Sequence, residues 1–287
     1  MSLYRLEEPD APLAAPVMVA ALDGWIDAAG AATNATEHLA VDATRIATFD
    51  GDVLFDFRSR RPMLDIIDGT LRELSWPALT IDRARIEERD VLVLHGAEPD
   101  FRWRELGGAV LEVCLRLGVV EWVSLGTIPA AVPHTRPVPV LGTASAPGLL
   151  KHEVTQGPEG LLRVPSAALS TIEMAVTGSG IPAVGFYGQV PHYVGGPFAA
   201  ATLALLDHMG RHLGISIPLG DLPEQAMNQR QRLDAAAASD DDTREYIERL
   251  ERMVGEEQRI PSGEEIAQEF ERFLRNQGGE RPTESPD

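Results

Sequence analysis

The chain has 287 residues, of which 44% are hydrophobic, and its formal net charge is −19 at pH 7. A surface this acidic repels phosphate backbones and anionic lipids, so we expect neither nucleic acid nor a membrane surface as a partner. No apolar run reaches the roughly 18 residues of a membrane helix, the N-terminus has no signal-peptide pattern, and Cys114 is the only cysteine, so the sequence predicts a cytoplasmic protein without internal disulfides.

The hydrophobic pattern predicts alternating strands and helices over residues 1–220. Continuous apolar runs are typical of buried strands, and apolar stripes at helical spacing indicate amphipathic helices. On these criteria we expect, in chain order, a strand at 16–22, a helix at 26–39 and a strand at 44–49, followed between 53 and 86 by short antiparallel hairpins whose strands are broken at Pro62, Asp68-Gly69 and Pro77. We then expect a strand at 91–95, a helix at 101–117, a strand at 120–125 that ends at Gly126, a strand at 138–142, a helix at 167–177, a strand at 183–187, and a helix from Pro197 to about 213. This alternation favours a three-layer α/β fold, in which helices cover both faces of a mixed or mostly parallel sheet.

The composition becomes polar and acidic beyond Asp221, which indicates a separate helical extension at 221–277 and a disordered tail at 278–287. We expect helices at 222–236, 243–254 and 263–277, with a disordered link at 239–242. Two of these helices carry apolar stripes that either the main domain or a partner chain must cover. The stripes are Ile247, Leu250 and Val254 in one helix, and Ile266, Phe270, Phe273 and Leu274 in the other.

Charged and aromatic residues follow four of the predicted strands. Because the carboxyl ends of parallel strands meet at one edge of a sheet, these residues are expected to converge in a ligand-binding cleft. The candidate cleft residues are Asp23, Trp25, Glu98, Arg102, Trp103, His134, Arg136, His192 and Tyr193. The alternative is a structural role, in which Asp27 and Asp100 cap helices, the tryptophans fill the core and the charges pair at the surface.

His134 and Arg136 lie in a loop that Pro133 and Pro137 stiffen. In an extended loop, positions i and i+2 project to the same side, so the two side chains could hold a carboxylate or a phosphate between them. The alternative is that Arg136 stacks on a tryptophan or pairs with Glu98.

Several motifs of catalytic or cofactor-binding proteins are absent from the sequence. Neither a phosphate-binding Gly-x4-Gly-Lys loop nor a Gly-x-Ser-x-Gly elbow occurs, and Lys151 is the only lysine. His208 and His212 have the spacing of metal ligands on a helix, but no third ligand is evident. Cys114 lies on the apolar face of its helix, which is typical of a buried, inert thiol. We therefore predict no catalytic set, no metal and no cofactor.

Four loop motifs follow one another along the chain: Gly24-Trp25-Ile26-Asp27-Ala28-Ala29-Gly30, Gly96-Ala97-Glu98-Pro99 with Arg102-Trp103, Leu125-Gly126 with Pro133-His134-Thr135-Arg136-Pro137, and Pro191-His192-Tyr193. The motifs in this order resemble the PAC2 family, which is named for a proteasome assembly chaperone. The resemblance covers residues 5–220, and the helical extension is similar to that of the actinobacterial branch. It implies a fold similar to that of nucleoside phosphorylases, self-association with a trimer as the favoured form, and proteasome subunits as candidate partners.

Two functions follow from these observations. The one we favour is an oligomeric, non-enzymatic, chaperone-like binding protein of the PAC2 family. The other is an enzyme or sensor that binds a nucleoside-like or phosphorylated small molecule, with arginine holding an anion and His134 or Glu98 moving a proton. Some archaeal relatives dock on the proteasome through a C-terminal hydrophobic–Tyr–any motif, but Pro286 stands in the tyrosine position here, so this route is not expected.

Overall fold

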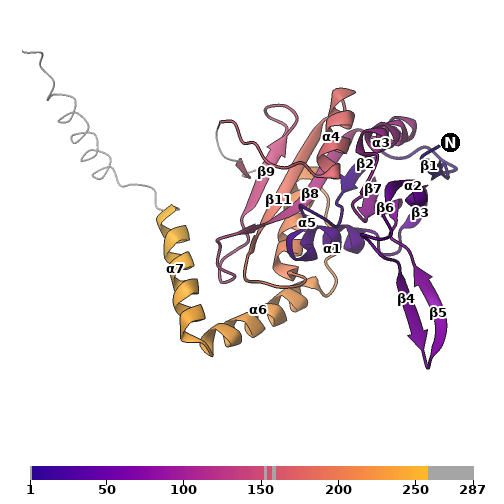
Figure 1. Cartoon of the computed structure of the whole chain (residues 1–287). Coiled ribbons are helices and arrows are strands. Elements are labelled where there is room, and N and C mark those ends of the chain that lie inside the picture. The colour runs from indigo at the N-terminus through magenta and orange to yellow at the C-terminus, as the bar shows by residue number, and fades with distance from the viewer. Residues whose placement is uncertain (1, 152–153, 157–159, 258–287) are drawn as a thin grey trace, which may run out of the picture.

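The computed structural model describes residues 2–151, 154–156 and 160–257. Within these residues, nine strands form one mixed sheet in the order β1-β3-β6-β7-β2-β8-β11-β9-β10 (Figure 1). The strands are β1 (Tyr4–Leu6), β2 (Val17–Ala20), β3 (Thr44–Phe49), β6 (Leu79–Ile86), β7 (Arg89–Gly96), β8 (Glu121–Ala130), β9 (Val140–Ala144), β10 (Thr155–Gln156) and β11 (Ala183–Pro191). The predicted α/β class is therefore confirmed.

The centre of the sheet is parallel. β2 pairs in parallel with β7 and β8, and β8 pairs in parallel with β11. The antiparallel strands β6, β3 and β1 extend the sheet on one side, and β9 pairs antiparallel with β11 on the other. All four residues of β2 are fully buried, as the continuous apolar run predicts for a strand covered on both faces. The carboxyl ends of β7, β2, β8 and β11 consequently lie along one edge of the sheet.

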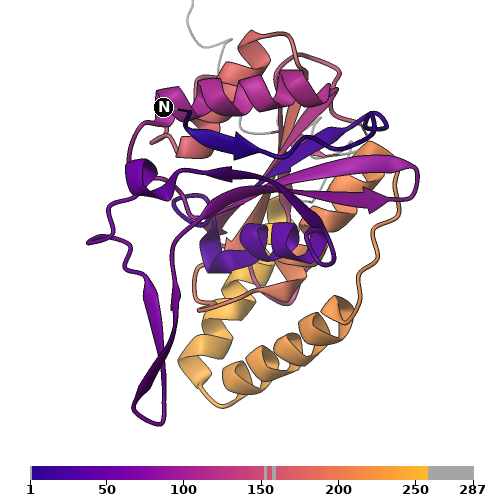
Figure 2. The same ribbon diagram turned by 90° about the vertical axis from the view of Figure 1, so that its right-hand side faces the viewer.

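Helices cover both faces of the sheet (Figure 2). α3 (Trp103–Leu117) and α4 (Ala168–Gly178) pack on one face, and α1 (Ala31–Leu39) and α5 (Ala199–Leu213) pack on the other. The alternation of side chains along β2 explains this division, because Met18 joins the core on the α3 side whereas Val17 and Val19 join the core on the α5 side. The three-layer architecture matches the prediction.

The strands β8 and β11 run further than the sequence predicts. We expected β8 to end at Leu125, but β8 and β11 stay in register until Ala130 pairs with Pro191. Gly126 lies inside β8, and the Tyr187 ring packs so closely against it that only a glycine fits. A Cβ atom at this position would lie 2.6 Å from Tyr187 Cδ1. The glycine that we interpreted as the end of a strand is therefore a packing residue.

Several predicted helix starts are also shifted, among them those of α1 and α5. A short 3-10 turn, η1 (Ala28–Gly30), precedes α1, because Ala29 and Gly30 adopt left-handed conformations with φ of 56° and 62°. Pro197 lies before α5, whose first helical residue is Ala199, rather than in its first turn.

A separate hairpin projects from the body of the molecule (Figures 1 and 2). It consists of β4 (Met63–Ile67) and β5 (Thr70–Ser75), and it follows the short helix α2 (Gly51–Leu54). Asp68 and Gly69 form its two-residue turn with φ of 50° and 75°, and two positive φ angles are typical of a type I′ turn. Every residue of the two strands is exposed. The hairpin expected at Asp68-Gly69 is thus confirmed.

The C-terminal extension forms two helices, α6 (Leu222–Ala238) and α7 (Asp241–Glu257), which are joined at an angle (Figure 1). The link that we expected to be disordered is a tight turn, in which the Asp240 carboxylate accepts a hydrogen bond from the Thr243 N–H at 3.0 Å. Ile247 and Leu250 are 6% and 2% exposed, so this chain itself covers their stripe. The helix expected at 263–277 and the tail at 278–287 lie outside the described residues. Of the helices described, none has the length and hydropathy needed to cross a bilayer.

Candidate functional site

All four candidate loops leave the sheet at the same edge, but their residues fall into two groups. Glu98 contacts the start of α4, which covers one face of the sheet. His134 contacts α6, which packs against α5 on the other face. No hydrogen bond, ion pair or ring contact joins the two groups within the part of the chain that the structure describes. Ligand binding at this edge remains a prediction.

Glu98 connects three segments of the chain. Its Oε2 accepts a hydrogen bond from the Trp25 N–H at 3.3 Å, and its Oε1 accepts one from the Ala168 N–H at 2.7 Å, at the start of α4. The first N–H groups of a helix have no partners within that helix, so a carboxylate here satisfies a donor and interacts favourably with the helix dipole. A Cβ atom on Gly24 would collide with the Glu98 carboxylate. Glu98 therefore has a clear structural role.

The other residues of this group differ in their surroundings. Trp103 donates its indole N–H to the Pro99 carbonyl at 2.6 Å and packs against the core, whereas Trp25 is 65% exposed. Arg102 has a left-handed backbone with φ of 59° and pairs with Glu105 at 3.2 Å on the surface. Asp23 forms an ion pair with Arg60 at the base of the β4–β5 hairpin. Of the two tryptophans in the predicted cleft, Trp103 fits the alternative in which the tryptophans fill the core and Trp25 does not.

The two aspartates expected as helix caps also differ. Asp27 Oδ1 accepts hydrogen bonds from the N–H groups of Ala32 and Thr33, at 2.9 and 3.2 Å, and so caps α1. Asp100 instead accepts a hydrogen bond from the Asp56 N–H at 2.8 Å and thereby holds the segment that leads to the hairpin. The predicted capping role is correct for Asp27 and wrong for Asp100, because α3 begins after Arg102 without a side-chain cap.

The second group is built around the buried side chain of His134. The Tyr193 hydroxyl lies 2.8 Å from the His134 backbone N–H and 2.8 Å from its Nδ1, and Nε2 lies 3.1 Å from Asp234 Oδ1. Since the hydroxyl accepts from the backbone N–H, it can donate its own proton to Nδ1, which leaves the proton of a neutral imidazole on Nε2, facing Asp234. Burial lowers the pKa of His134, although Asp234 acts in the opposite direction, and burial raises the pKa of Tyr193.

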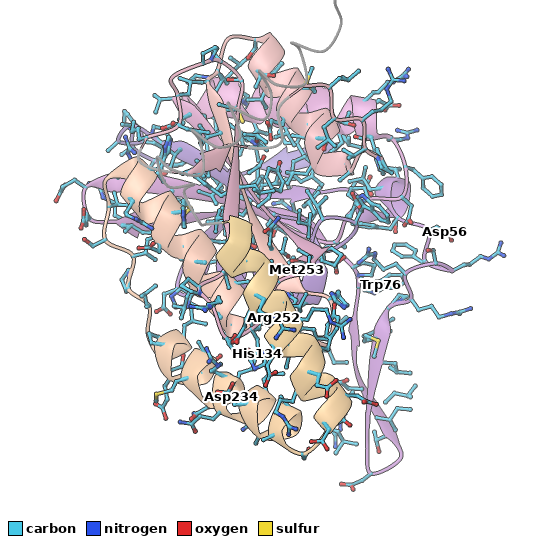
Figure 3. The ribbon with its side chains drawn as sticks, turned by 90° about the vertical axis from the view of Figure 1, so that its left-hand side faces the viewer. Asp56, Trp76, His134, Asp234, Arg252 and Met253 are labelled. Carbon is cyan, nitrogen blue, oxygen red and sulfur yellow. The ribbon has the colours of Figure 1, made fainter. Side chains whose placement is uncertain are left out.

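The partners of this group come from α6 and α7 (Figure 3). Arg230 donates to both oxygens of Asp234 at 3.0 Å and to the His134 carbonyl at 3.3 Å. On α7, the Tyr246 hydroxyl lies 3.1 Å from His192 Nε2, and its ring makes edge contacts with His192 and Tyr193. Figure 3 shows His134 close to Asp234, which α6 carries. The C-terminal helices therefore cover this half of the predicted cleft.

Arg136 does not join His134. The segment 133–136 forms a turn, in which the Arg136 N–H donates to the Pro133 carbonyl at 3.4 Å, instead of the extended loop that we expected. The turn sends the two side chains in different directions: His134 is 6% exposed and Arg136 lies at the surface. The expectation that they project to the same side is wrong for this reason.

Sequence reasoning did not identify Arg230, Asp234 and Tyr246 as members of this group. They lie 96, 100 and 54 residues from their partners, and no local pattern marks a polar helix residue as the partner of a distant imidazole. A candidate signal was the predicted apolar stripe of α7, which required a covering surface.

The remaining polar candidates are also engaged within the fold. His208 Nδ1 lies 2.8 Å from the Ala204 carbonyl, and His212 is buried with its Nε2 2.8 Å from Glu121. Cys114 is fully buried, as expected, and burial raises its pKa to about 12. The described residues contain no group of three His, Cys, Asp or Glu side chains that could hold a metal ion.

An open groove lies at the base of the β4–β5 hairpin, with a cavity volume of about 640 Å³. Its lining includes Asp23, Arg60, Arg61, Trp76 and His95. His95 Nε2 lies 2.8 Å from Asp82 Oδ2 in the neighbouring strand. Asp23 is the only residue of the predicted cleft in this lining, so the groove differs from the cleft that we expected.

Comparison with known proteins places the chain in a family. The sequence model of the PAC2 family matches residues 21–237, which is more than half of the chain. The chain belongs to the PAC2 family. Among proteins of curated function, no significant match to this PAC2 protein is found.

Solved structures of actinobacterial proteins resemble this PAC2 protein over most of their length. A proteasome-assembly chaperone homologue from Mycobacterium tuberculosis is 38% identical, covers 80% of this chain and 99% of its own, and has a TM-score of 0.74. A second M. tuberculosis protein, of unknown function, is 31% identical with coverages of 88% and 91% and a TM-score of 0.82. A Corynebacterium glutamicum protein of unknown function is 28% identical, with coverages of 90% and 98% and a TM-score of 0.83.

Proposed function

We propose that this PAC2 protein is an oligomeric, non-enzymatic binding protein of the chaperone-like kind, with proteasome subunits as candidate partners. The observation that carries the proposal is the network around His134. Its imidazole would be the natural proton carrier of a cleft at this edge, but Tyr193 and Asp234 occupy both ring nitrogens and α6 covers it. A general base must reach the proton that it removes, so an imidazole enclosed in this way is unsuited to catalysis.

The relatives support the same proposal. A homologue at 38% identity is described as a proteasome-assembly chaperone homologue, and its similarity extends over nearly the whole of that protein. The strongly acidic charge of −19 fits a protein whose partners are other proteins rather than nucleic acids. Self-association is part of the proposal, with a trimer as the expected form.

The proposal is tested with the full chain and the purified proteasome α-subunits of the same organism. Native mass spectrometry of the chain alone should give a multiple of its 31.1 kDa mass, and the mixture should give a complex that contains α-subunits. His134→Gln should keep this binding, because His134 supports the fold and not the contact. A chain that stays monomeric and forms no complex with α-subunits would refute the proposal.

The alternative of an enzyme or sensor is favoured by one observation, the groove at the base of the hairpin. Arg60, Arg61 and His95 supply cationic and imidazole groups there, which suit a phosphorylated or nucleoside-like ligand. A thermal-shift screen with nucleosides, nucleotides and sugar phosphates discriminates between the two functions. A ligand at 100 times its Kd stabilises the folded state by about 2.7 kcal/mol, and loss of that shift in Arg61→Ala would favour the alternative.

A further inference from the structure

His95 differs from His134 because one of its ring nitrogens has no partner. Its Nε2 lies 2.8 Å from Asp82 Oδ2, and its side chain is 16% exposed. Within the described residues Nδ1 makes no hydrogen bond, and these residues contain no buried side-chain nitrogen or oxygen that lacks a partner. Nδ1 is therefore open to solvent, in the groove of about 640 Å³ that His95 lines.

Asp82 determines which nitrogen of His95 carries the proton. Arg45 donates to both oxygens of Asp82, at 2.9 and 3.3 Å. Burial acts to raise the pKa of Asp82, but the hydrogen bonds from Arg45 and His95 outweigh burial and hold this pKa below its ordinary value. An ionised carboxylate only accepts hydrogen bonds, so the proton of a neutral His95 imidazole lies on Nε2. Nδ1 then presents its lone pair to the groove and can accept a hydrogen bond from a ligand.

A second acceptor of the same groove comes from α1. Val91 and Val93 of β7 belong to the core between the sheet and α5, and the alternation along the strand places His95 on that face. α1 lies on the same face and contributes Glu37 to the lining of the groove. Within the part of the chain that the structure describes, the Glu37 carboxylate forms no hydrogen bond or ion pair. Nδ1 of His95 and the carboxylate of Glu37 therefore suit a ligand with neighbouring hydroxyl groups.

The segment beside the hairpin contributes a cation and an aromatic ring. Arg60 is compensated by Asp23, whereas Arg61 is exposed and forms no ion pair in the described ranges. Trp76 is 53% exposed, and its ring meets the Phe57 ring edge to face with the centroids 4.7 Å apart (Figure 3). A guanidinium binds phosphate oxygens, and an exposed aromatic ring offers a surface on which a base can stack.

We propose that this groove binds a nucleoside monophosphate. The ribose hydroxyls donate to His95 Nδ1 and to Glu37, the phosphate accepts from Arg61, and the base stacks on Trp76. The groove has the volume of a small-molecule site, for which about 300–1,000 Å³ is typical. The inference rests on the second candidate function and deepens it, because it names the class of ligand and the imidazole that recognises it.

Isothermal titration calorimetry of the full chain tests the proposal with the 5′-monophosphates of adenosine, guanosine, cytidine and uridine. We expect at least one of them to bind with a Kd below about 1 mM, and inorganic phosphate to bind at least about tenfold more weakly, because it reaches Arg61 alone. The 2′,3′-dideoxy form of the nucleotide that binds best lacks both ribose hydroxyls. It should also bind at least about tenfold more weakly, since it leaves the two acceptors of the groove without partners.

His95→Gln tests the role of Nδ1. The glutamine amide can take the place of Nε2 and keep the hydrogen bond to Asp82, but it has no atom in the place of Nδ1. The variant should bind the nucleotide about tenfold more weakly, and the difference between the ribose and dideoxy forms should become smaller. His208→Gln is the matched control, because His208 Nδ1 bonds to the Ala204 carbonyl of its own helix and His208 does not line the groove. It should bind as the wild type does.

The proposal is wrong if none of the four nucleotides binds to the wild type, or if the ribose and dideoxy forms bind equally well. It is also wrong if inorganic phosphate binds as tightly as the nucleotide, or if His95→Gln binds like the wild type. Should circular dichroism show that His95→Gln does not fold, the comparison of the two nucleotide forms on the wild type still decides. Binding of proteasome α-subunits is measured separately, so the chaperone-like function can stand when this proposal fails.

Discussion

Removal of the Tyr193 hydroxyl tests whether the network around His134 holds the C-terminal helices to the α/β domain. Tyr193→Phe keeps the ring but deletes an oxygen that lies 2.8 Å from both the backbone nitrogen and Nδ1 of His134. His134 is 6% exposed, so water does not readily replace the lost bonds. A buried polar group left without a partner costs about 1–3 kcal/mol, and we expect a loss of about 2 kcal/mol. For a chain of this size that corresponds to a fall in Tm of about 3 °C.

Tyr246→Phe is the matched control. It also deletes one hydroxyl, but this hydroxyl bonds to His192 Nε2 at the surface, where water can take its place. We expect a change within about 0.5 kcal/mol. The assays are thermal unfolding and limited proteolysis, in which only Tyr193→Phe should make α6 and α7 easier to cleave. Equal effects of the two substitutions would refute the reasoning, because burial of the lost bonds would then not matter.

Two further predictions concern pH and packing. Burial lowers the pKa of His134 below its ordinary value of 6.5, so the unfolded chain takes up a proton below that pH when the folded chain does not. Stability should therefore fall as the pH decreases from 7 to 5, and His134→Gln should flatten this slope in urea titrations; an unchanged slope would contradict the assignment of a buried neutral imidazole. Gly126→Ala should lower the free energy of unfolding by about 1–3 kcal/mol, because the added Cβ would lie 2.6 Å from Tyr187 Cδ1. At Gly108, by contrast, nothing lies within 4 Å of an added Cβ. Gly108→Ala inside α3 should instead raise the free energy of unfolding by about 0.5–1 kcal/mol. If denaturant titrations showed Gly126→Ala to be the more stable of the two variants, close packing against Tyr187 would not be the reason for a glycine at 126.

Local pattern was sufficient for most of the fold. The run at 16–22 is apolar without interruption because β2 is covered on both faces, and the alternation of strands and helices led to the three-layer arrangement. Asp68-Gly69 predicted a hairpin because few other residue pairs accept two positive φ angles. The errors came where pairing between strands continues past a residue that usually ends a strand. Gly126 resembles the end of a strand in the sequence, but hydrogen bonding to β11 continues the strand to Ala130.

In the candidate site, local sequence patterns placed the residues but did not predict their contacts. Sequence position placed Glu98 and His134 just beyond the carboxyl ends of two strands of one sheet, and both lie there, after β7 and β8. Their partners were not predictable. Glu98 bonds to Ala168 on α4 and His134 bonds to Asp234 on α6, and each contact depends on how a distant helix packs. The turn at 133–136 directs the side chains of His134 and Arg136 apart, whereas their spacing alone had predicted that both project to the same side.

By itself, the amino-acid sequence determined the conformation of short segments, because hydrophobic periodicity and turn chemistry act over a few neighbouring residues. It therefore determined the buried parallel strands, the amphipathic helices and the projecting hairpin. Only the tertiary structure decided which side chains meet. The enclosure of His134 by Tyr193 and Asp234 depends on strand order and on the docking of α6, which bring together residues that are 59 and 100 positions apart.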